Sequence, residues 1–273
     1  MTNLFGDLRL GTTVLVLHAH PDDEVFATGV AAASLARQGC RVVLRVASGG
    51  EVGEPSAATA RNARRLRAVR LGRACRTLGM EWGWLDAGRW LDTGGIPAPD
   101  SLTSASVDDL ADAIAREVRR FAPEAILTVG SDGLTGHPDH ILMHRAVTRA
   151  VEGTARVFGA SLRASDVAAG RQLLARVLPG VEVGSGRMTG STREDLLTLD
   201  EPFYAPFRAG QVRRDAMNYY GPGLGTLPLA DLVRVYPGRG DSLLLRAVFD
   251  AVGWSTERYE PPVLSASTDS LVS

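Results

Sequence analysis

The sequence has no lysine, only two cysteines and no long hydrophobic run near its start. All 30 basic residues are arginine and nearly balance the 31 acidic ones, so the formal net charge of −1 offers no field to attract nucleic acid or an anionic membrane. Cys40 and Cys75 are too few for a disulfide scaffold and lack metal-ligand spacing, which predicts a reducing compartment. The run Val14–Leu17 is far shorter than the ~20 residues of a membrane span, and we recognise no signal peptide. We therefore expect a cytoplasmic protein with no membrane span.

Hydrophobic residues make up 45% of the 273 residues and charged residues 22%, which is ordinary globular usage and supplies enough apolar side chain for a core. No internal repeat, low-complexity tract or linker divides the chain. We expect a single domain over residues 1–273, with a core at 12–155 and a divergent part at 156–273.

The first half of the sequence alternates short apolar runs with helical patterns. The apolar runs are typical of buried strands and lie at Thr13–Leu17, Arg41–Val46, Trp82–Leu85 and Ala125–Val129. Four helical patterns follow these runs. They end near Arg37, at Leu78 before Gly79, at Phe121 after a start at Val107 with Ser106 as the N-cap, and at Val151 after a start near Pro138. This repetition predicts an α/β fold, Rossmann-like with three αβα layers and a mainly parallel sheet.

The pattern weakens past residue 155. The elements expected there are a strand at Arg156–Phe158, a helix at Ala164–Leu178 and a strand at Leu196–Leu199. Two loops rich in glycine and proline stand out, at Gly94–Pro99 and Gly221–Gly225, and the first is long enough to form a mobile rim.

Two dense polar clusters each follow a predicted buried strand. The first, His18–Glu24, follows Leu17, and the second, Ser131–His140, follows Val129. Because ligands of parallel sheets bind beyond the carboxyl ends of the strands, we expect both clusters at one edge of the sheet. Imidazole and carboxylate donors without thiolates suit Zn²⁺, or another divalent transition metal, at a hydrolytic site with three protein ligands and one open position.

The segments His20-Pro-Asp-Asp-Glu24 and His137-Pro-Asp-His140 together resemble the paired motifs of the GlcNAc-PI de-N-acetylase (PIG-L/LmbE-like) family of zinc-dependent N-deacetylases. Ser48–Gly53 is similar to that family's Thr-x-Gly-Glu-x-Gly loop, and Leu78-Gly79 to its helix end. The resemblance covers roughly residues 12–150. It implies one deacetylase domain with a Zn²⁺ site at the carboxyl ends of the strands, and it leaves residues 156–273 to shape the substrate site.

Roles for individual residues follow from this resemblance. It implies Asp22 as the general base and His137 as the electrostatic partner of the oxyanion and the general acid, with His137 oriented by Asp139. The metal ligands that it implies are His20, Asp23 and His140.

Two departures from the family pattern bear on the substrate. Arg67-Ala-Val-Arg70 stands where the family often has Arg-x-x-Glu, and Thr135 stands where some relatives have a tyrosine near the oxyanion. We expect the segment Trp90–Asp100 to form a lid that contacts substrate. The candidate substrate-binding residues are Glu51, Arg67, Trp90 and Thr135.

Other polar features have a structural explanation beside a functional one. His18 follows the same strand as the ligands, and we favour a supporting or packing role for it. His144, four residues after His140, could chelate metal, but we favour a partly buried histidine. The seven arginines from Arg61 to Arg76 are typical of a solvated helix face, and a site for a substrate phosphate is the alternative.

The resemblance implies an enzyme that hydrolyses the acetamide of an N-acetylamino sugar of the GlcNAc type, in a glycoconjugate or a specialised metabolite such as an antibiotic precursor, and releases acetate and an amine. One alternative is an amidase that cleaves a thiol-sugar conjugate. Another is a non-catalytic carbohydrate-binding protein on the same fold. A metallophosphoesterase is disfavoured because its two-metal site needs more ligands. The sequence predicts a small-molecule partner and leaves the oligomeric state open.

Overall fold

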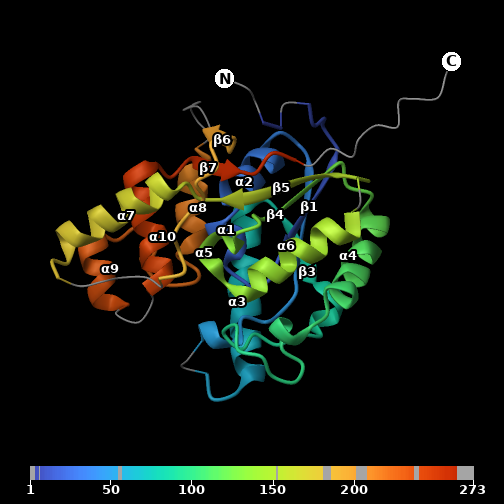
Figure 1. The fold of residues 1–273 in the computed structure, drawn as a ribbon, viewed down its shortest axis with the longest axis horizontal. Coiled ribbons are helices and arrows are strands. Elements are labelled where there is room, and N and C mark those ends of the chain that lie inside the picture. The colour runs from blue at the N-terminus through green and yellow to red at the C-terminus, as the bar shows by residue number, and fades with distance from the viewer. Residues whose placement is uncertain are drawn as a thin grey trace.

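In a computed structural model of the chain, the carboxyl ends of the parallel strands lie on one side of the sheet (Figure 1). The structure describes residues 4, 5, 7–54, 57–151, 153–180, 186–200, 208–236 and 240–262. Seven strands in these residues make a single sheet, in the order β3-β2-β1-β4-β5-β7-β6.

Five of these strands are parallel to one another, as expected from the sequence. They are β1 (Thr13–His18), β2 (Arg41–Val46), β3 (Glu81–Trp84), β4 (Ala125–Val129) and β5 (Arg156–Ser161). The two strands from the C-terminal part, β6 (Leu197–Asp200) and β7 (Thr256–Tyr259), pair antiparallel with each other, and β7 pairs antiparallel with β5. The α/β prediction with a mainly parallel sheet is thus confirmed.

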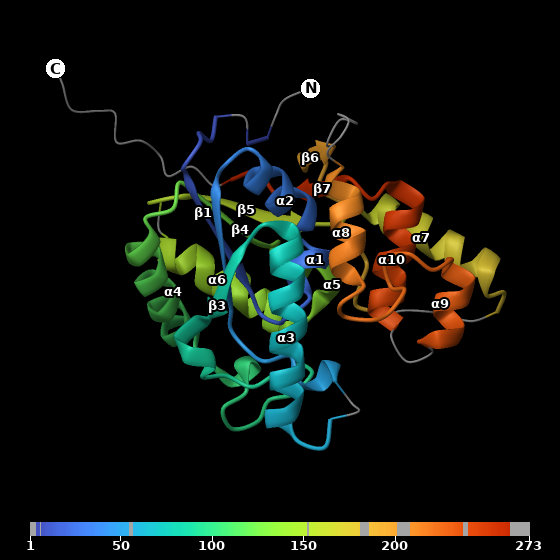
Figure 2. The same cartoon turned by 180° about the vertical axis from the view of Figure 1, so that it is seen from behind.

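Helices cover both faces of the sheet, because side chains of the buried strands alternate between two apolar cores. Val14 and Val16 of β1 face one core, and Leu15 and Leu17 face the other. Figure 2 shows α2 (Gly29–Arg37), α3 (Ala60–Leu78) and α8 (Ala209–Met217) over the first core. Figure 1 shows α4 (Val107–Phe121) and α6 (Pro138–Val151) over the second.

The remaining helices extend the first layer or connect the strands. Two helices of the C-terminal part, α7 (Ala164–Val177) and α10 (Gly240–Val252), pack against each other beside α9 (Leu229–Val235). The short ones are α1 (Asp23–Phe26), α5 (Gly133–Gly136), η1 (Glu51–Gly53), η2 (Leu85–Gly88) and η3 (Leu102–Ser104).

Local sequence signals explain where the well-predicted helices begin and end. The Ser106 side chain accepts the Asp109 amide at the start of α4, and Gly79 ends α3 in the left-handed conformation, at φ 78°. Two differences from the prediction stand out. The helix expected to run to Arg37 is divided into α1 and α2, and β3 ends one residue early because Leu85 begins η2.

Two further expectations concern the environment of the protein. No helix in the described ranges is long and apolar enough to cross a membrane. Cys40 and Cys75 are both free and buried. The division into a core at 12–155 and a divergent part at 156–273 stays a prediction, although β6 and β7 extend the same sheet.

Candidate metal centre and active site

The first polar cluster begins where β1 ends and turns through Pro21 into α1. Asp22, at this turn, has a φ of 106°, a conformation that costs a non-glycine residue roughly 1–3 kcal/mol and persists only where neighbouring contacts impose it. Its amide donates to Oε2 of Glu24 at 2.9 Å, and its carbonyl accepts the amide of Val25 at 3.0 Å. The turn therefore directs two consecutive carboxyl groups, those of Asp22 and Asp23, toward the strand ends.

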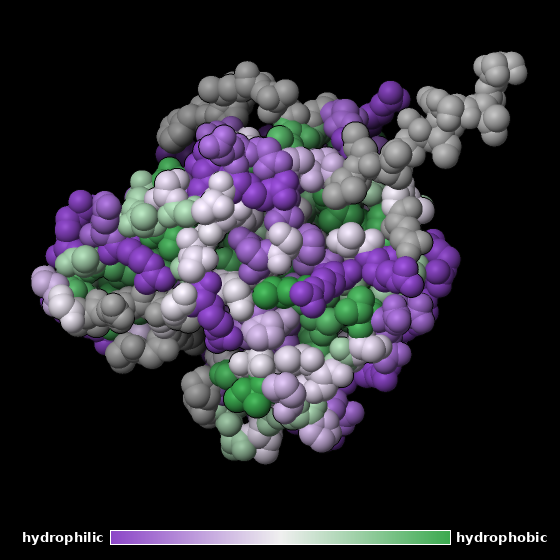
Figure 3. Space-filling model, in the orientation of Figure 1, coloured by the Kyte–Doolittle hydropathy of each residue, from purple (hydrophilic) through white to green (hydrophobic). Residues whose placement is uncertain are grey.

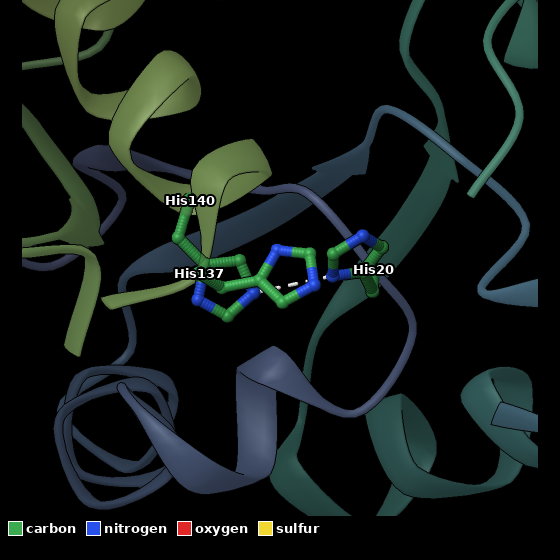
Figure 4. Close-up of side chains that lie close together, drawn as sticks. All are labelled: His20, His137 and His140. Atoms are coloured by element: carbon green, nitrogen blue, oxygen red, sulfur yellow. Dashed lines mark hydrogen bonds between the residues drawn. The ribbon is translucent and has the colours of Figure 1, made fainter. Parts of the chain in front are cut away.

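The second cluster connects β4 to α6. Gly133 and Gly136 both have positive φ, at 68° and 72°, which lets the chain fold tightly through α5. Pro138 is the first residue of α6, where its missing amide costs no hydrogen bond. His140 then lies in the first turn of α6, on the side that faces the first cluster (Figure 4).

The two clusters meet at three side chains. Nδ1 of His20 lies 3.1 Å from Nε2 of His140, and that nitrogen lies 3.1 Å from Oδ1 of Asp23. The other Asp23 oxygen is 3.9 Å from His20 Nδ1. Ligand atoms around a tetrahedral Zn²⁺ with bonds near 2.0–2.1 Å are about 3.3 Å apart. The expected ligands are thus within shared coordination reach.

The outward-facing nitrogens of the two histidines are fixed by acceptors. Nε2 of His20 lies 3.0 Å from Oδ2 of Asp139, and Nδ1 of His140 lies 3.0 Å from the carbonyl of Gly133. A proton on each of these nitrogens leaves the inward nitrogens as lone pairs that face each other and Asp23. Three electron-rich atoms this close need a shared proton or a cation between them, and this donor set fits a divalent metal ion.

The charges of the cluster also favour a bound cation. Burial disfavours a charged ring at His20, but Asp92, Asp139 and Asp23 raise its pKa to about 10. Burial likewise opposes ionisation of Asp23, yet its neighbours His140 and His20 hold the pKa of Asp23 well below the usual value. The site therefore attracts positive charge.

Other donors lie within reach of His20. Two groups of three side chains, each with ligand atoms within 4.8 Å of one another, are His20 with His137 and His140, and His20 with Asp92 and Asp139. The set implied by the resemblance, His20, Asp23 and His140, stays a prediction. Its geometry fits a metal as well, because the backbone amides of Ala19 and His20 fix Asp23 and the inward histidine nitrogens are 3.1 Å apart.

Asp92 was not expected at the site. Its Oδ1 lies 3.6 Å from Nε2 of His20 and accepts the Gly94 amide, while its Oδ2 accepts the Val52 amide. The sequence signal that could have found it is an acid within the predicted lid segment, Trp90–Asp100, which follows the third predicted strand.

Asp22 lies next to the cluster and is held by a buried arginine. Nη2 of Arg67 donates to Oδ2 of Asp22 at 2.9 Å and also to the Pro21 carbonyl. Burial raises the pKa of Asp22 even though Arg67 opposes the shift. The Asp22 side chain keeps 26% of its surface exposed, so it can reach a substrate.

The structure gives His137 and Asp139 a different relation from the expected one. The Asp139 carboxylate bonds to His20 and to the hydroxyl of Thr103, and only the Asp139 amide reaches Nδ1 of His137, at 3.3 Å. Burial, with the neighbouring His20, lowers the pKa of His137 to about 4, so its ring is neutral at neutral pH rather than protonated. The ring packs against those of His20 and His140 (Figure 4).

The four candidate substrate contacts are mostly buried. Trp90 is 3% exposed within the second core and Arg67 2%, so neither side chain is placed to bind a substrate directly. Glu51 uses both oxygens, for Nε of Arg64 and the Asp92 amide, each at 2.9 Å. Thr135 is buried on α5. Glu51 thus bonds to the backbone of the predicted lid, and Trp90, the first residue of that lid, packs in the second core.

Two histidines outside the ligand set have structural partners. Nε2 of His18 bonds to the hydroxyl of Thr28 at 2.9 Å, and burial lowers the pKa of His18 to about 4. Nδ1 of His144 bonds to the Val129 carbonyl at 2.9 Å. Both contacts fit the packing roles that we favoured.

The run of arginines in α3 has two faces. Three residues spaced three apart pair with acids of the site loops: Arg64 with Glu51, Arg67 with Asp22, and Arg70 with Glu54. The remaining four are exposed, namely Arg61, Arg65, Arg73 and Arg76. On the face of α3 that points toward the site, the arginines therefore bind carboxylates of the protein itself. The alternative interpretation was that these arginines bind a phosphate group of the substrate.

Comparison with known sequences gives a family. The sequence model of the family described as PIG-L: GlcNAc-PI de-N-acetylase matches residues 15–151, half of the chain. The 1D-myo-inositol 2-acetamido-2-deoxy-alpha-D-glucopyranoside deacetylase 1 of Frankia casuarinae is 37% identical over 153 residues, which cover 50% of this chain and 50% of that protein. The chain therefore spans about half the length of this curated relative.

Solved structures share the fold at low sequence identity. The zinc-inhibited form of teicoplanin deacetylase Orf2 has a TM-score of 0.61 at 18% identity, over 94% of this chain and 100% of that chain. The 4-carboxy-2-hydroxymuconate hydratase GalB of Pseudomonas putida KT2440 has a TM-score of 0.52 at 19% identity, over 96% of this chain and 100% of that one. One fold thus carries a deacetylase and a hydratase, so an activity has to be argued from the site.

Proposed function

The chain belongs to the PIG-L: GlcNAc-PI de-N-acetylase family, and from this membership we propose that it is a metal-dependent N-deacetylase. The reaction would hydrolyse the acetamide of an N-acetylamino sugar to acetate and a free amine. The family resemblance seen in the sequence is confirmed by the match to residues 15–151. A curated relative named for a GlcNAc-inositol deacetylase supports a sugar acetamide as the substrate.

One observation carries the proposal. His20, Asp23 and His140 come from two segments about 120 residues apart, and their inward atoms lie 3.1 to 3.9 Å from one another next to Asp22. A histidine-rich cation site beside a partly exposed carboxylate supplies the two groups that metal-dependent hydrolysis uses, a Lewis acid and a general base.

Zinc is the metal that this donor set favours. The two imidazoles of His20 and His140 and the carboxylate of Asp23 match a catalytic zinc site, which keeps a position open for substrate or water. When bound, the ion would polarise the acetamide carbonyl and acidify water. Asp139 and the Gly133 carbonyl would keep the two imidazoles in their ligating orientation, as acceptors of the outward N–H groups.

Asp22 is the proposed general base. Its carboxylate would take a proton from the attacking water as the new C–O bond forms, and it would return that proton to the amine nitrogen as the C–N bond breaks. Arg67 would keep Oδ2 of Asp22 in place, so that Oδ1 is left for this proton transfer. Arg67 therefore acts as a positioning residue and not as a substrate contact.

His137 is the proposed hydrogen-bond donor to the developing oxyanion. Its Nδ1 accepts the Asp139 amide, which places the ring proton on Nε2. The Nε2–H group of a neutral imidazole can donate a hydrogen bond to the oxyanion, and the ring stays neutral as it does so. Preorganised donors in oxyanion holes act in the same way. We also infer a cytoplasmic location, to which the two free, buried cysteines are suited.

Acetate release tests the proposal directly. The full chain, loaded with one equivalent of Zn²⁺, is incubated with GlcNAc-inositol, with free GlcNAc and with a bulky thiol-sugar conjugate. We expect equimolar acetate and amine from at least one acetamide, loss of release after dialysis against a chelator, and recovery when zinc is restored.

The other outcomes separate the alternatives. Cleavage of the thiol-sugar conjugate without acetate release would favour the amidase. Tight sugar binding by the zinc-loaded chain with no hydrolysis would indicate a binding protein. Either result, or full acetate release by the metal-free chain, would contradict the proposed function.

A further inference from the structure

The amino end of α2 is capped by a residue from the far end of the chain. Thr28, which precedes α2, bonds through its hydroxyl to His18 and makes no cap bond. The amides of Val30 and Ala31 instead donate to the two carboxylate oxygens of Glu257 on β7, at 2.8 and 3.0 Å. A carboxylate is favourable at this end of a helix, so Glu257 does what Thr28 would ordinarily do.

The carboxyl end of α1 is held in turn by Arg213 on α8. Its Nε donates to the carbonyl of Val25 at 2.8 Å and its Nη2 to that of Phe26 at 2.5 Å. In an unbroken helix, the Phe26 carbonyl would accept the amide of Val30. Here the Val30 amide donates to Glu257 instead, and Arg213 donates to the Phe26 carbonyl in its place.

Arg213 and Glu257 form a buried pair across the break between α1 and α2. Their charged groups are 3.8 Å apart, and the side chains are 1% and 3% exposed. Within the described residues, Nη1 of Arg213 has no hydrogen-bond partner. A buried ion pair with an unsatisfied nitrogen is a poor source of stability compared with apolar packing. Its specific effect is to fix where α1 ends and α2 begins.

The position of α1 matters because α1 carries the site. Asp23 is its first residue, and Asp22 precedes it in a strained conformation. A helix of four residues cannot hold itself in place, so its direction depends on contacts at both ends. Arg67 holds the amino end through Asp22, and Arg213 holds the carboxyl end. Figures 1 and 2 show α8 beside α1 and α2 from both sides.

We propose that Arg213 is a positioning residue that sets the direction of Asp22 and Asp23 through the carboxyl end of α1, with Glu257 as its partner. Both residues lie outside residues 15–151, the part matched by the family. The catalytic roles of Asp22 and Asp23 in this statement rest on the proposed function. The mechanical role of Arg213 does not, and it can be measured without a substrate.

Arg246 offers a matched control for the experiment. It is also a buried arginine of the C-terminal part, 3% exposed, and it donates to two backbone carbonyls, those of Leu224 and Leu227. It also pairs with Asp250 on α10 and lies over the Trp254 ring, and none of these partners belongs to α1. Arg213→Lys and Arg246→Lys therefore remove comparable buried contacts at different places.

Each full-length variant is measured in two ways: the dissociation constant of Zn²⁺ by chelator competition, and hydrogen exchange of the α1 amides in the metal-free protein. We expect Arg213→Lys to weaken zinc binding about tenfold or more and to speed exchange at Val25 and Phe26. Arg246→Lys should leave both quantities within about twofold of the parent. If the parent deacetylates a sugar, kcat should fall in Arg213→Lys with KM little changed.

Equal zinc affinities and equal α1 exchange in the two variants would overturn the proposal, because the effect of Arg213 would then be general stability. If Arg213→Lys does not fold, Glu257→Gln replaces it with the same expected changes and the same contradicting result. A parent that binds zinc but releases no acetate would refute the proposed function alone, since neither the zinc nor the exchange comparison uses a substrate.

Discussion

Replacing His140 with alanine is expected to abolish tight zinc binding and to lower kcat for acetate release roughly a thousandfold or more. His140 supplies the nitrogen that faces both other proposed ligands, at 3.1 Å from His20 Nδ1 and 3.1 Å from Asp23 Oδ1. Loss of one of three protein ligands removes the ion, whose polarisation of a carbonyl is worth several kcal/mol. Since about 1.4 kcal/mol corresponds to tenfold in rate, the loss spans several decades. Metal content after desalting and steady-state kinetics measure the two effects.

His144→Ala is the control for this substitution. His144 lies one turn further along α6, and its Nδ1 bonds to the Val129 carbonyl. Its removal should lower stability moderately and leave one zinc per chain with nearly unchanged kcat. If His140→Ala kept its zinc, or if His144→Ala lost it, the ligand assignment would be wrong.

Asp22→Asn should separate metal binding from turnover. We expect one bound zinc per chain and a kcat lower by about 10²–10⁴-fold, because an amide cannot take a proton from water. Asparagine tolerates the positive φ of this position and can still accept from Arg67, so the turn is kept. Metal analysis and kcat from acetate release check both parts.

Asp86→Asn provides the comparison for Asp22→Asn. Asp86 also has a positive φ, 46°, and also pairs with an arginine, but it lies in η2 and that partner, Arg116, is 52% exposed. Its loss of charge should change kcat by less than about twofold, since exposed pairs contribute little. Normal turnover by Asp22→Asn would show that another group is the base.

The sequence predicts well what depends on short segments and on parallel strands. The runs ending at Leu17 and Val129 become β1 and β4, which lie side by side in the sheet. Their ends therefore bring His20 and His140 together, as the rule for parallel sheets requires. The N-cap of α4 at Ser106 is also predicted correctly, because a capping side chain bonds to an amide within one turn of the same helix.

The sequence predicts poorly what depends on partners far along the chain. Glu257 caps α2 across 227 positions, and Arg213 reaches α1 across 188, so no local pattern reveals either. Arg67 illustrates the same limit, since its place in a basic run favours an exposed residue while its contact with Asp22 requires a buried one. The division between α1 and α2 was missed for this reason.

The most direct measurement is the anomalous difference map of a zinc-loaded crystal, recorded on both sides of the zinc absorption edge. The account predicts one strong peak per chain, about 2.0–2.1 Å from Nδ1 of His20, Nε2 of His140 and an oxygen of Asp23. Asp22 should lie next to the ion without binding it. A peak at other residues, or no peak in crystals whose protein carries stoichiometric zinc, would contradict the account.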